Sequence, residues 1–172
     1  ANQGEINIED LPLPLSIIAT DIGNGDRVVF REGSLTKAMR ASMSVPGLLA
    51  PVEHQGRKLV DGGLVDNVPI GEVRDRCKAD VVIAVNVGSP LMKPEEIGSL
   101  LTVSGQMVNI LTEQNVTRSL ALLTVDDIYI KPDLEGITAG DFPRHAETAD
   151  RGRAAAEALI PSLQHLSQPE PV

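Results

Sequence analysis

The run of aliphatic residues from Val81 to Val85 constrains the fold of this chain more than any other stretch. It lies within segment 79–88, which we predict to be a strand. An unbroken apolar run indicates a strand buried on both faces, and such strands are central in parallel sheets. A helix is predicted just before it, from Pro69 to Cys77. Because a helix followed by a buried strand is half of a βαβ unit, the sequence predicts an α/β fold.

The other predicted elements follow from turn signals and periodicity. Asn24-Gly25 marks the tip of one hairpin, and residues 54–57 mark a second, whose return strand ends at Asp61. Ser34 is a suitable N-cap for the first helix. Pro161 is expected to start a new turn or a kink in the last helix. The full set comprises strands at 15–20, 27–30, 58–61, 79–88 and 127–132, a first helix that begins at Leu35 and ends at Pro46-Gly47, and further helices at 69–77, 94–123 and 144–166.

The composition limits which residue types can form the core and which partners the chain can bind. Aromatic residues make up only 2% of the chain, so the core must be aliphatic, as in α/β layers. The formal net charge of −9 argues against nucleic acid as a partner. One cysteine, Cys77, allows no internal disulfide, and the three histidines lack metal-site spacing. We therefore expect no metal and no other cofactor.

The stretch from Lys58 to Ile70 carries the candidate site. An apolar pair runs into Asp61, and Gly62 and Gly63 follow at once. Glycines accept a positive φ and allow close approach of another segment, so this is a suitable place to hold a carboxylate against a partner group. The alternative is a plain turn, because Asp-Gly is also a common hairpin signal.

The residues that follow Gly63 are expected to have structural roles. Asn67 and Pro69 are expected to shape the loop and cap the next helix. Asp66 is expected to be solvated. The Gly23-x-Gly25 pair does not predict a dinucleotide site, because position 28 is Val and a strand follows.

Three stretches in order resemble the patatin-like phospholipase family. Residues 41–47, Ala-Ser-Met-Ser-Val-Pro-Gly, resemble its Ala-Ser-x-x-x-Pro-Gly segment. Residues 60–63 resemble its Asp-Gly-Gly/Ala motif, and residues 66–69 resemble the Asn-x-Pro that follows. The resemblance extends from about Leu15 to Leu166 and looks most like bacterial members.

The resemblance implies a three-layer α/β/α sandwich and hydrolysis of lipid or phospholipid acyl esters by a Ser–Asp dyad without histidine. It makes Asp61 the dyad aspartate, with Gly62, Gly63 and Asn67 shaping the site. A free aspartate has a pKa of about 4 and is a weak base at neutral pH. The site must therefore raise that pKa, or Asp61 must act largely by orienting the attack.

The chain departs from the family at the nucleophile. No serine here lies in Gly-x-Ser-x-Gly, and the glycine-rich oxyanion segment is absent. We therefore interpret residues 1–166 as the C-terminal part of a patatin-like domain, an incomplete sandwich that is inactive alone, with 167–172 as a tail or linker. A sheet cut in this way is expected to expose apolar surface and an unpaired edge.

Two functional hypotheses remain open from the sequence. One is a lipid acyl hydrolase represented by its aspartate-bearing part, and the other is a non-catalytic binding or regulatory module of the same fold. Transient contact with a membrane surface and homo-oligomer formation are both left open, although the net charge of −9 disfavours tight docking on anionic lipid. No uncharged apolar run is long enough to span a membrane.

Overall fold

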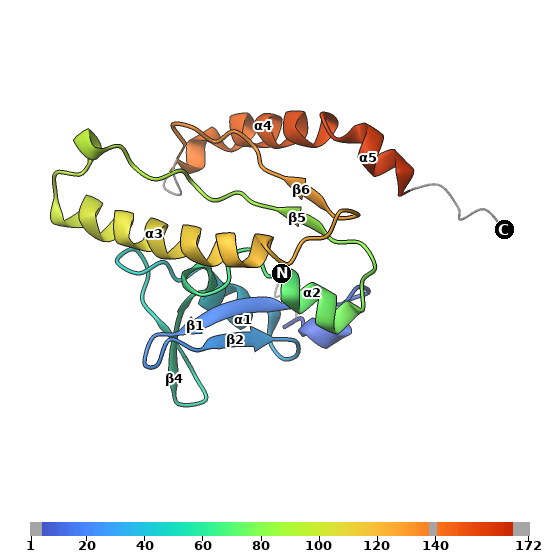
Figure 1. Cartoon of the computed structure of the whole chain (residues 1–172). Coiled ribbons are helices and arrows are strands. Elements are labelled where there is room, and N and C mark those ends of the chain that lie inside the picture. Colours follow the sequence, from blue (N-terminus) through green and yellow to red (C-terminus); the bar gives the residue numbers. More distant parts are fainter. Residues whose placement is uncertain (1–4, 138–140, 167–172) are drawn as a thin grey trace.

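The structure is a computed structural model that describes residues 5–137 and 141–166, and the backbone alone of Leu101. The predicted tail at 167–172 lies outside these residues. Figure 1 shows two packed regions, an antiparallel sheet with its covering helix and a smaller parallel sheet flanked by longer helices. The α/β class, consistent with a patatin-like fold, is confirmed.

The first region is a four-stranded antiparallel sheet in the order β2-β1-β4-β3. Its strands are β1 (Ile17–Asp21), β2 (Arg27–Phe30), β3 (Val52–His54) and β4 (Arg57–Asp61). Both predicted hairpins are present. Gly25 has a φ of +79°, while Gln55 and Gly56 have φ values of +49° and +77°, as tight hairpin turns require.

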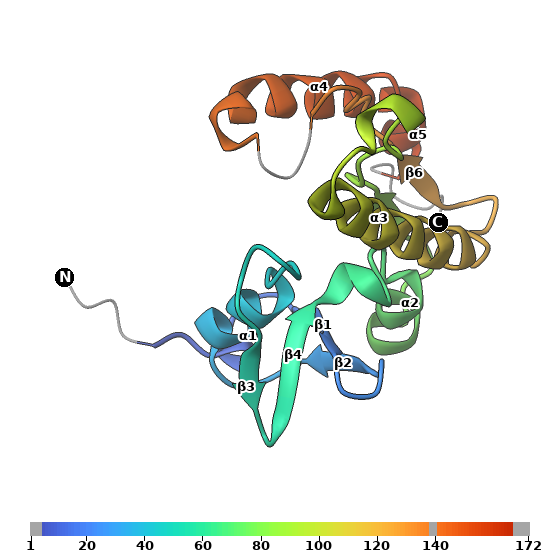
Figure 2. The ribbon, with the colours of Figure 1, turned by 90° about the vertical axis from the view of Figure 1, so that its left-hand side faces the viewer.

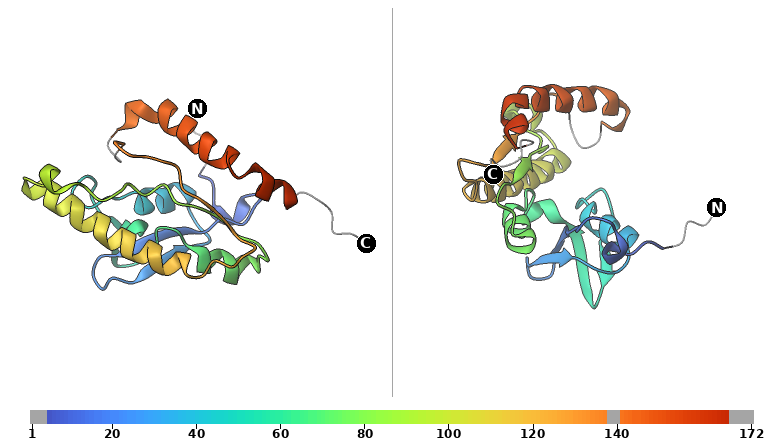
Figure 3. Two further views of the ribbon diagram at one scale, coloured as in Figure 1. Left: turned by 45° about the horizontal axis from the view of Figure 1, so that its top comes forward. Right: turned by 90° about the vertical axis from the view of Figure 1, so that its right-hand side faces the viewer.

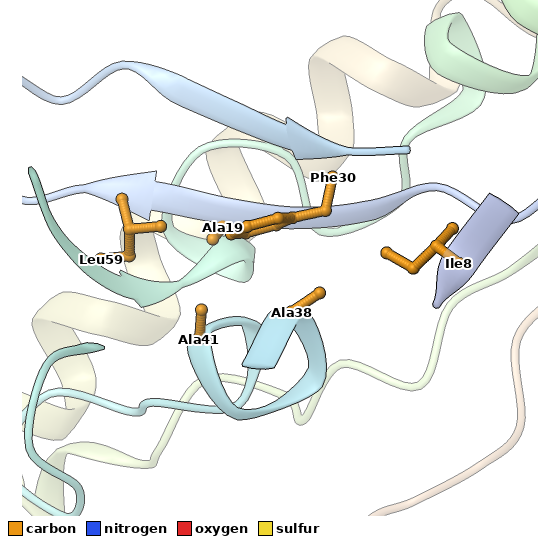
Figure 4. Close-up of a cluster of buried hydrophobic side chains, with 6 residues drawn as sticks. All are labelled: Ile8, Ala19, Phe30, Ala38, Ala41 and Leu59. Carbon is orange, nitrogen blue, oxygen red and sulfur yellow. The ribbon is translucent and has the colours of Figure 1, made fainter. Parts of the chain in front are cut away.

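Helix α1 (Leu35–Ser42) covers one face of this sheet and completes the first core. It begins at Ser34, whose hydroxyl accepts a hydrogen bond from the Lys37 amide at 3.3 Å, as predicted. Small residues on the helix allow close packing against the strands (Figure 4). The buried cluster consists of Ile8, Ala19, Phe30, Ala38, Ala41 and Leu59.

The second region is built on β5 (Ile83–Val85) and β6 (Ile128–Ile130), which pair in parallel. Helices α3 (Leu100–Leu120) and α4 (His145–Glu157) lie on opposite sides of this pair, as Figures 2 and 3 show. Helix α2 (Ile70–Cys77) connects the two regions, and α5 (Ile160–His165) follows α4 with Pro161 in its first turn, as predicted. The second core consists of Val68, Ile70, Val82, Ala84 and Val116.

The prediction that segment 79–88 is buried on both faces is wrong for the described residues. The parallel pairing is present, but the strand covers only Ile83–Val85, and burial alternates along it. Val82 and Ala84 face the core, whereas Ile83, Val85 and Val87 are 49%, 50% and 62% exposed. The reason is that Val82 and Ala84 pack with Val116 of α3, whereas α4, on the other side, has no buried residue and does not cover that face of the strand. This is the kind of exposed apolar surface that the sequence predicted.

Two acidic side chains bind the elements together. Glu72 on α2 accepts two hydrogen bonds of 2.8 Å from the Arg31 guanidinium and one of 2.7 Å from Ser16. Asp127 accepts from the backbone amides of Thr124 and Val82, at 2.6 and 2.7 Å, and also from Arg74. These contacts connect α2 to both sheets. In the described part of the chain, no helix combines the length and hydrophobicity needed to cross a membrane.

We expect both carboxylates to make folding acid-sensitive. The Arg31 hydrogen bonds lower the pKa of Glu72 from 4.5 to about 2, and the Thr124 amide and other donors lower that of Asp127 from 3.8 to about 2. Because each folded-state pKa is depressed, the stabilisation is complete above the ordinary pKa and is lost as the pH falls toward 2.

Urea denaturation between pH 6 and pH 2 measures this effect. Glu72→Gln and Asp127→Asn should lower the free energy of unfolding at pH 6 and flatten its decline in acid. Glu113→Gln, at an exposed position of α3, serves as the control. Acid profiles of Glu72→Gln and Asp127→Asn that run parallel to that of the wild type would contradict the assignment.

Candidate active site at the end of β4

The backbone of Asp61 is fixed from two sides. Asp61 is the last residue of β4 and pairs with Ala19 of β1. Its amide donates to the Ser44 carbonyl at 3.0 Å, and its carbonyl accepts from the Thr20 hydroxyl at 2.8 Å. Ser44 belongs to the predicted segment 41–47, so this segment supports the strand end that carries the aspartate.

One oxygen of the Asp61 carboxylate is held and the other is free. Oδ1 accepts a hydrogen bond of 2.7 Å from the Gly63 amide, and Asp61 thereby caps the short 3-10 turn Gly62–Leu64. Within residues 5–137 and 141–166, Oδ2 has no hydrogen-bond partner. Burial raises the pKa of Asp61 above 3.8, although the Gly63 hydrogen bond opposes this shift. The side chain is therefore oriented yet keeps one oxygen available to exchange a proton.

The two glycines are needed for close approach and not for a positive φ. A Cβ on Gly62 would lie 2.2 Å from the carbonyl oxygen of Ile18, so no side chain fits there. A Cβ on Gly63 would lie 2.8 Å from Oδ1 of Asn67. Neither residue has a positive φ. The sequence prediction of close approach is confirmed, and its suggestion of a left-handed turn is wrong at these two positions.

Asn67 lies in the loop, as predicted, whereas the environment of Asp66 differs from the predicted one. The Asn67 amide donates to the side chain of Asn115 at 2.9 Å, so Asn67 is part of the loop. Pro69 is the N-cap residue of α2, as predicted, but no side chain accepts a hydrogen bond from the first turn, so capping by the Asn67 side chain is wrong. Asp66 is not solvated, since it pairs with Arg27 at 2.5 Å and accepts from Ser119 at 3.3 Å. In both cases the hydrogen-bond or ion-pair partner lies far away in the sequence, where local pattern cannot identify it.

A pocket of about 510 Å³ lies beside Asp61. Its walls combine the aspartate and glycine loop with apolar side chains from β1, α1 and the start of α2. The lining includes Ile17, Ile18, Met39, Met43, Asp61, Gly62, Gly63, Asn67 and Pro69, together with Ser16, Ser42 and Asp66. A partly apolar pocket with one carboxylate can accept a ligand that has a hydrocarbon part and a reactive polar group.

Histidine does not contribute to this pocket. His54 lies in β3 with its ring centroid 5.0 Å from that of Phe30, and burial lowers its pKa. Across the described ranges, no three His, Cys, Asp or Glu side chains are arranged to hold a metal ion. The titratable group of the pocket that combines a raised pKa with a free oxygen is Asp61.

Sequence reasoning missed the support that α3 gives to this loop. Asn115 is 3% exposed and hydrogen-bonds to Gly63 and Asn67, and Thr112 also donates to Gly63. The available signal was an asparagine, a poor helix former, at a position on the apolar side of a long helix. The partner of that asparagine lies 52 residues earlier and cannot be found from local pattern.

The comparisons with known proteins agree with this combination of fold and pocket. A family model described as patatin-like phospholipase matches residues 7–74, which include β1 to β4 and the Asp61 loop. Residues 7–74 of this chain are thus similar to the patatin-like phospholipase family.

Relatives of this chain are similar over part of their length. An uncharacterized NTE family protein of Mycobacterium tuberculosis is 43% identical over 84 residues, covering 49% of this chain and 23% of the relative. A second from the same organism is 29% identical, covering 91% and 30%. Lysophospholipase NTE1 of Kluyveromyces lactis is 26% identical, covering 98% and 13%. The chain thus spans less than a third of these relatives.

Substitution of Gly62 should disturb the site by sterics alone. Gly62→Ala places a methyl group against the Ile18 carbonyl, so we expect a loss of about 1–3 kcal/mol in the free energy of unfolding. Gly152→Ala in α4 is the matched control, because nothing lies within 4 Å of the new Cβ. It should stabilise the helix by about 0.5–1 kcal/mol. Urea denaturation measures both, and equal effects would refute the close-approach argument.

Asp61→Asn should stabilise the folded chain at pH 7. A raised folded-state pKa means that the ionised carboxylate is disfavoured by burial, and Asn removes this charge while its Oδ1 can still accept from Gly63. The gain should shrink as the pH falls through about 4, where the aspartate is protonated in both states. Asp150→Asn on the exposed side of α4 is the control. A less stable Asp61→Asn at pH 7 would contradict the burial argument.

Proposed function

We propose that this chain supplies the aspartate of a Ser–Asp dyad in an enzyme that hydrolyses lipid acyl esters. The match of residues 7–74 to the patatin-like phospholipase model and the similarity to a lysophospholipase support the general class of lipid hydrolase. The observation that carries the finer proposal is the Asp61 carboxylate, with Oδ1 held by Gly63 and Oδ2 free beside a partly apolar pocket. Gly62, Gly63 and Asn67 shape this site.

In the proposed reaction, Asp61 takes the proton of a serine hydroxyl while the serine oxygen attacks the acyl carbonyl. The tetrahedral intermediate then collapses, the acyl–serine ester forms, and the proton passes from Asp61 to the leaving alcohol. Water releases the acid by the reverse proton transfers. Burial favours this role, since a carboxylate with a raised pKa is a stronger base. Asp61 also orients the serine.

The apolar wall of the pocket suits the acyl part of the substrate. Ile17 and Ile18 come from β1, Met39 lies on α1, and Met43 is the C-cap residue one turn later. Methionine side chains adapt to flexible hydrocarbon chains. The proposed partner is therefore a lipid or phospholipid ester, met during transient contact with a lipid surface. Association of the protein with itself remains a prediction from the sequence.

The serine of the dyad is proposed to lie outside these 172 residues, because none of their serines is in Gly-x-Ser-x-Gly. The same observation favours a second candidate, a patatin-fold module that binds lipid without hydrolysing it. The two candidates differ in whether the natural polypeptide containing this chain has such a serine. On the first proposal, the 172 residues alone are inactive.

Hydrolysis of a short-chain p-nitrophenyl ester and of a phospholipid tests the proposal. The assay compares the 172-residue chain, the natural polypeptide that contains it, and that polypeptide with Asp61→Asn or Asp150→Asn. We expect activity in the natural polypeptide and its Asp150→Asn control only, with a loss of about 10²–10⁴-fold in kcat for Asp61→Asn. Unchanged kcat in Asp61→Asn would exclude the dyad, and lipid binding without hydrolysis would favour the binding module.

A further inference from the structure

The side chain of Asn115 bridges the two ends of the loop that follows Asp61. Its Oδ1 accepts a hydrogen bond of 2.9 Å from the Asn67 amide. Its Nδ2 donates to the Gly63 carbonyl at 2.7 Å and to the Leu111 carbonyl at 3.1 Å. Asn115 is 3% exposed, so these contacts are made away from bulk water and both its amide hydrogens are used.

Thr112 strengthens the same connection from one turn earlier on α3. Its hydroxyl donates to the Gly63 carbonyl at 3.1 Å. The Gly63 carbonyl thus receives two donors from α3, while the Gly63 amide donates to Oδ1 of Asp61 at 2.7 Å. Gly63 is therefore the residue through which α3 acts on the aspartate.

The identity of Gly63 makes this connection necessary. A glycine has no Cβ to restrict φ and ψ, so its own conformational preferences do not set the direction of its amide. Contacts on its other side must do so. The hydrogen bonds to its carbonyl fix one side of the residue, and the amide on the other side then points at the carboxylate.

We propose that Asn115 is a positioning residue that holds the Gly63 amide against Asp61 Oδ1 and so directs the free Oδ2 into the pocket. Thr112 assists it as the second donor. The catalytic consequence rests on the proposed function, whereas the positioning itself is a property of this chain. A purely structural role would instead mean that Asn115 anchors α3 without affecting the Asp61–Gly63 pair.

The Gly63 amide provides a direct readout in the folded chain. In ¹H–¹⁵N NMR spectra its proton shift should follow the ionisation of Asp61, and its hydrogen exchange should be slow. In Asn115→Ala we expect exchange at least about tenfold faster and a smaller pH-dependent shift, with unchanged exchange in the β1–β2 pair. Gln114→Ala, at the exposed neighbouring position, should match the wild type.

Two further variants distinguish the donors to the Gly63 carbonyl from the Asn115 oxygen that accepts from the Asn67 amide. Asn115→Asp retains an oxygen for the Asn67 amide but loses the donor to Gly63, so it should resemble Asn115→Ala. Thr112→Val removes one of the two donors to the Gly63 carbonyl and should give a smaller change in the same direction. This variant keeps the proposal testable if Asn115→Ala fails to fold. Slow Gly63 exchange and a normal titration in folded Asn115→Asp or Asn115→Ala would overturn the proposal.

Activity gives a separate comparison in the natural polypeptide. Asn115→Ala should lower kcat more than it changes KM, since it misdirects the base without altering the apolar wall. If the Gly63 readout changes as expected while Asp61→Asn remains fully active, positioning by Asn115 stands and the Ser–Asp proposal fails. If Asp61→Asn is inactive while the Gly63 readout and kcat of folded Asn115→Ala are unchanged, the dyad stands and positioning by Asn115 fails.

Discussion

The contact of Gly62 with β1 is the constraint on which the site depends. A strand end can present a carboxylate at a defined place only if the chain leaves the strand at a defined angle. Here the chain turns so tightly that a Cβ on Gly62 would lie 2.2 Å from the Ile18 carbonyl oxygen. The 3-10 turn that follows returns the Gly63 amide to Asp61. Sheet pairing, turn and carboxylate orientation are therefore parts of one local geometry.

The loop from Gly62 to Val68 also connects the two cores. Asp61 belongs to β4 of the antiparallel sheet, whereas Val68 and Ile70 belong to the core beneath α3. Figure 1 shows α3 lying across the junction between the two regions. Hydrogen bonds from Thr112 and Asn115 join this helix to the loop. The site is thus located where the two regions meet, a common position for ligand pockets.

The surroundings of the acidic residues separate a candidate base from structural anions. Glu72, Asp127 and Glu147 each accept several hydrogen bonds, which hold their pKa values below the ordinary range. Asp61 is half-buried with a single donor, and its pKa is raised. Carboxylates of the same chemistry therefore serve different purposes, because the number of hydrogen-bond donors that offsets desolvation differs.

Local pattern determined the α/β class, both hairpins, the Ser34 cap, the new turn at Pro161 and the prominence of Asp61-Gly62-Gly63. These depend on residues within a few positions of one another, where turn geometry and strand alternation act directly. Only the tertiary structure decided that Asp66 pairs with Arg27, that β5 is covered on one face, and that Asn115 holds Gly63. The physical reason is that burial and hydrogen-bond partners at 39 and 52 residues' separation arise from packing, which no local sequence pattern specifies.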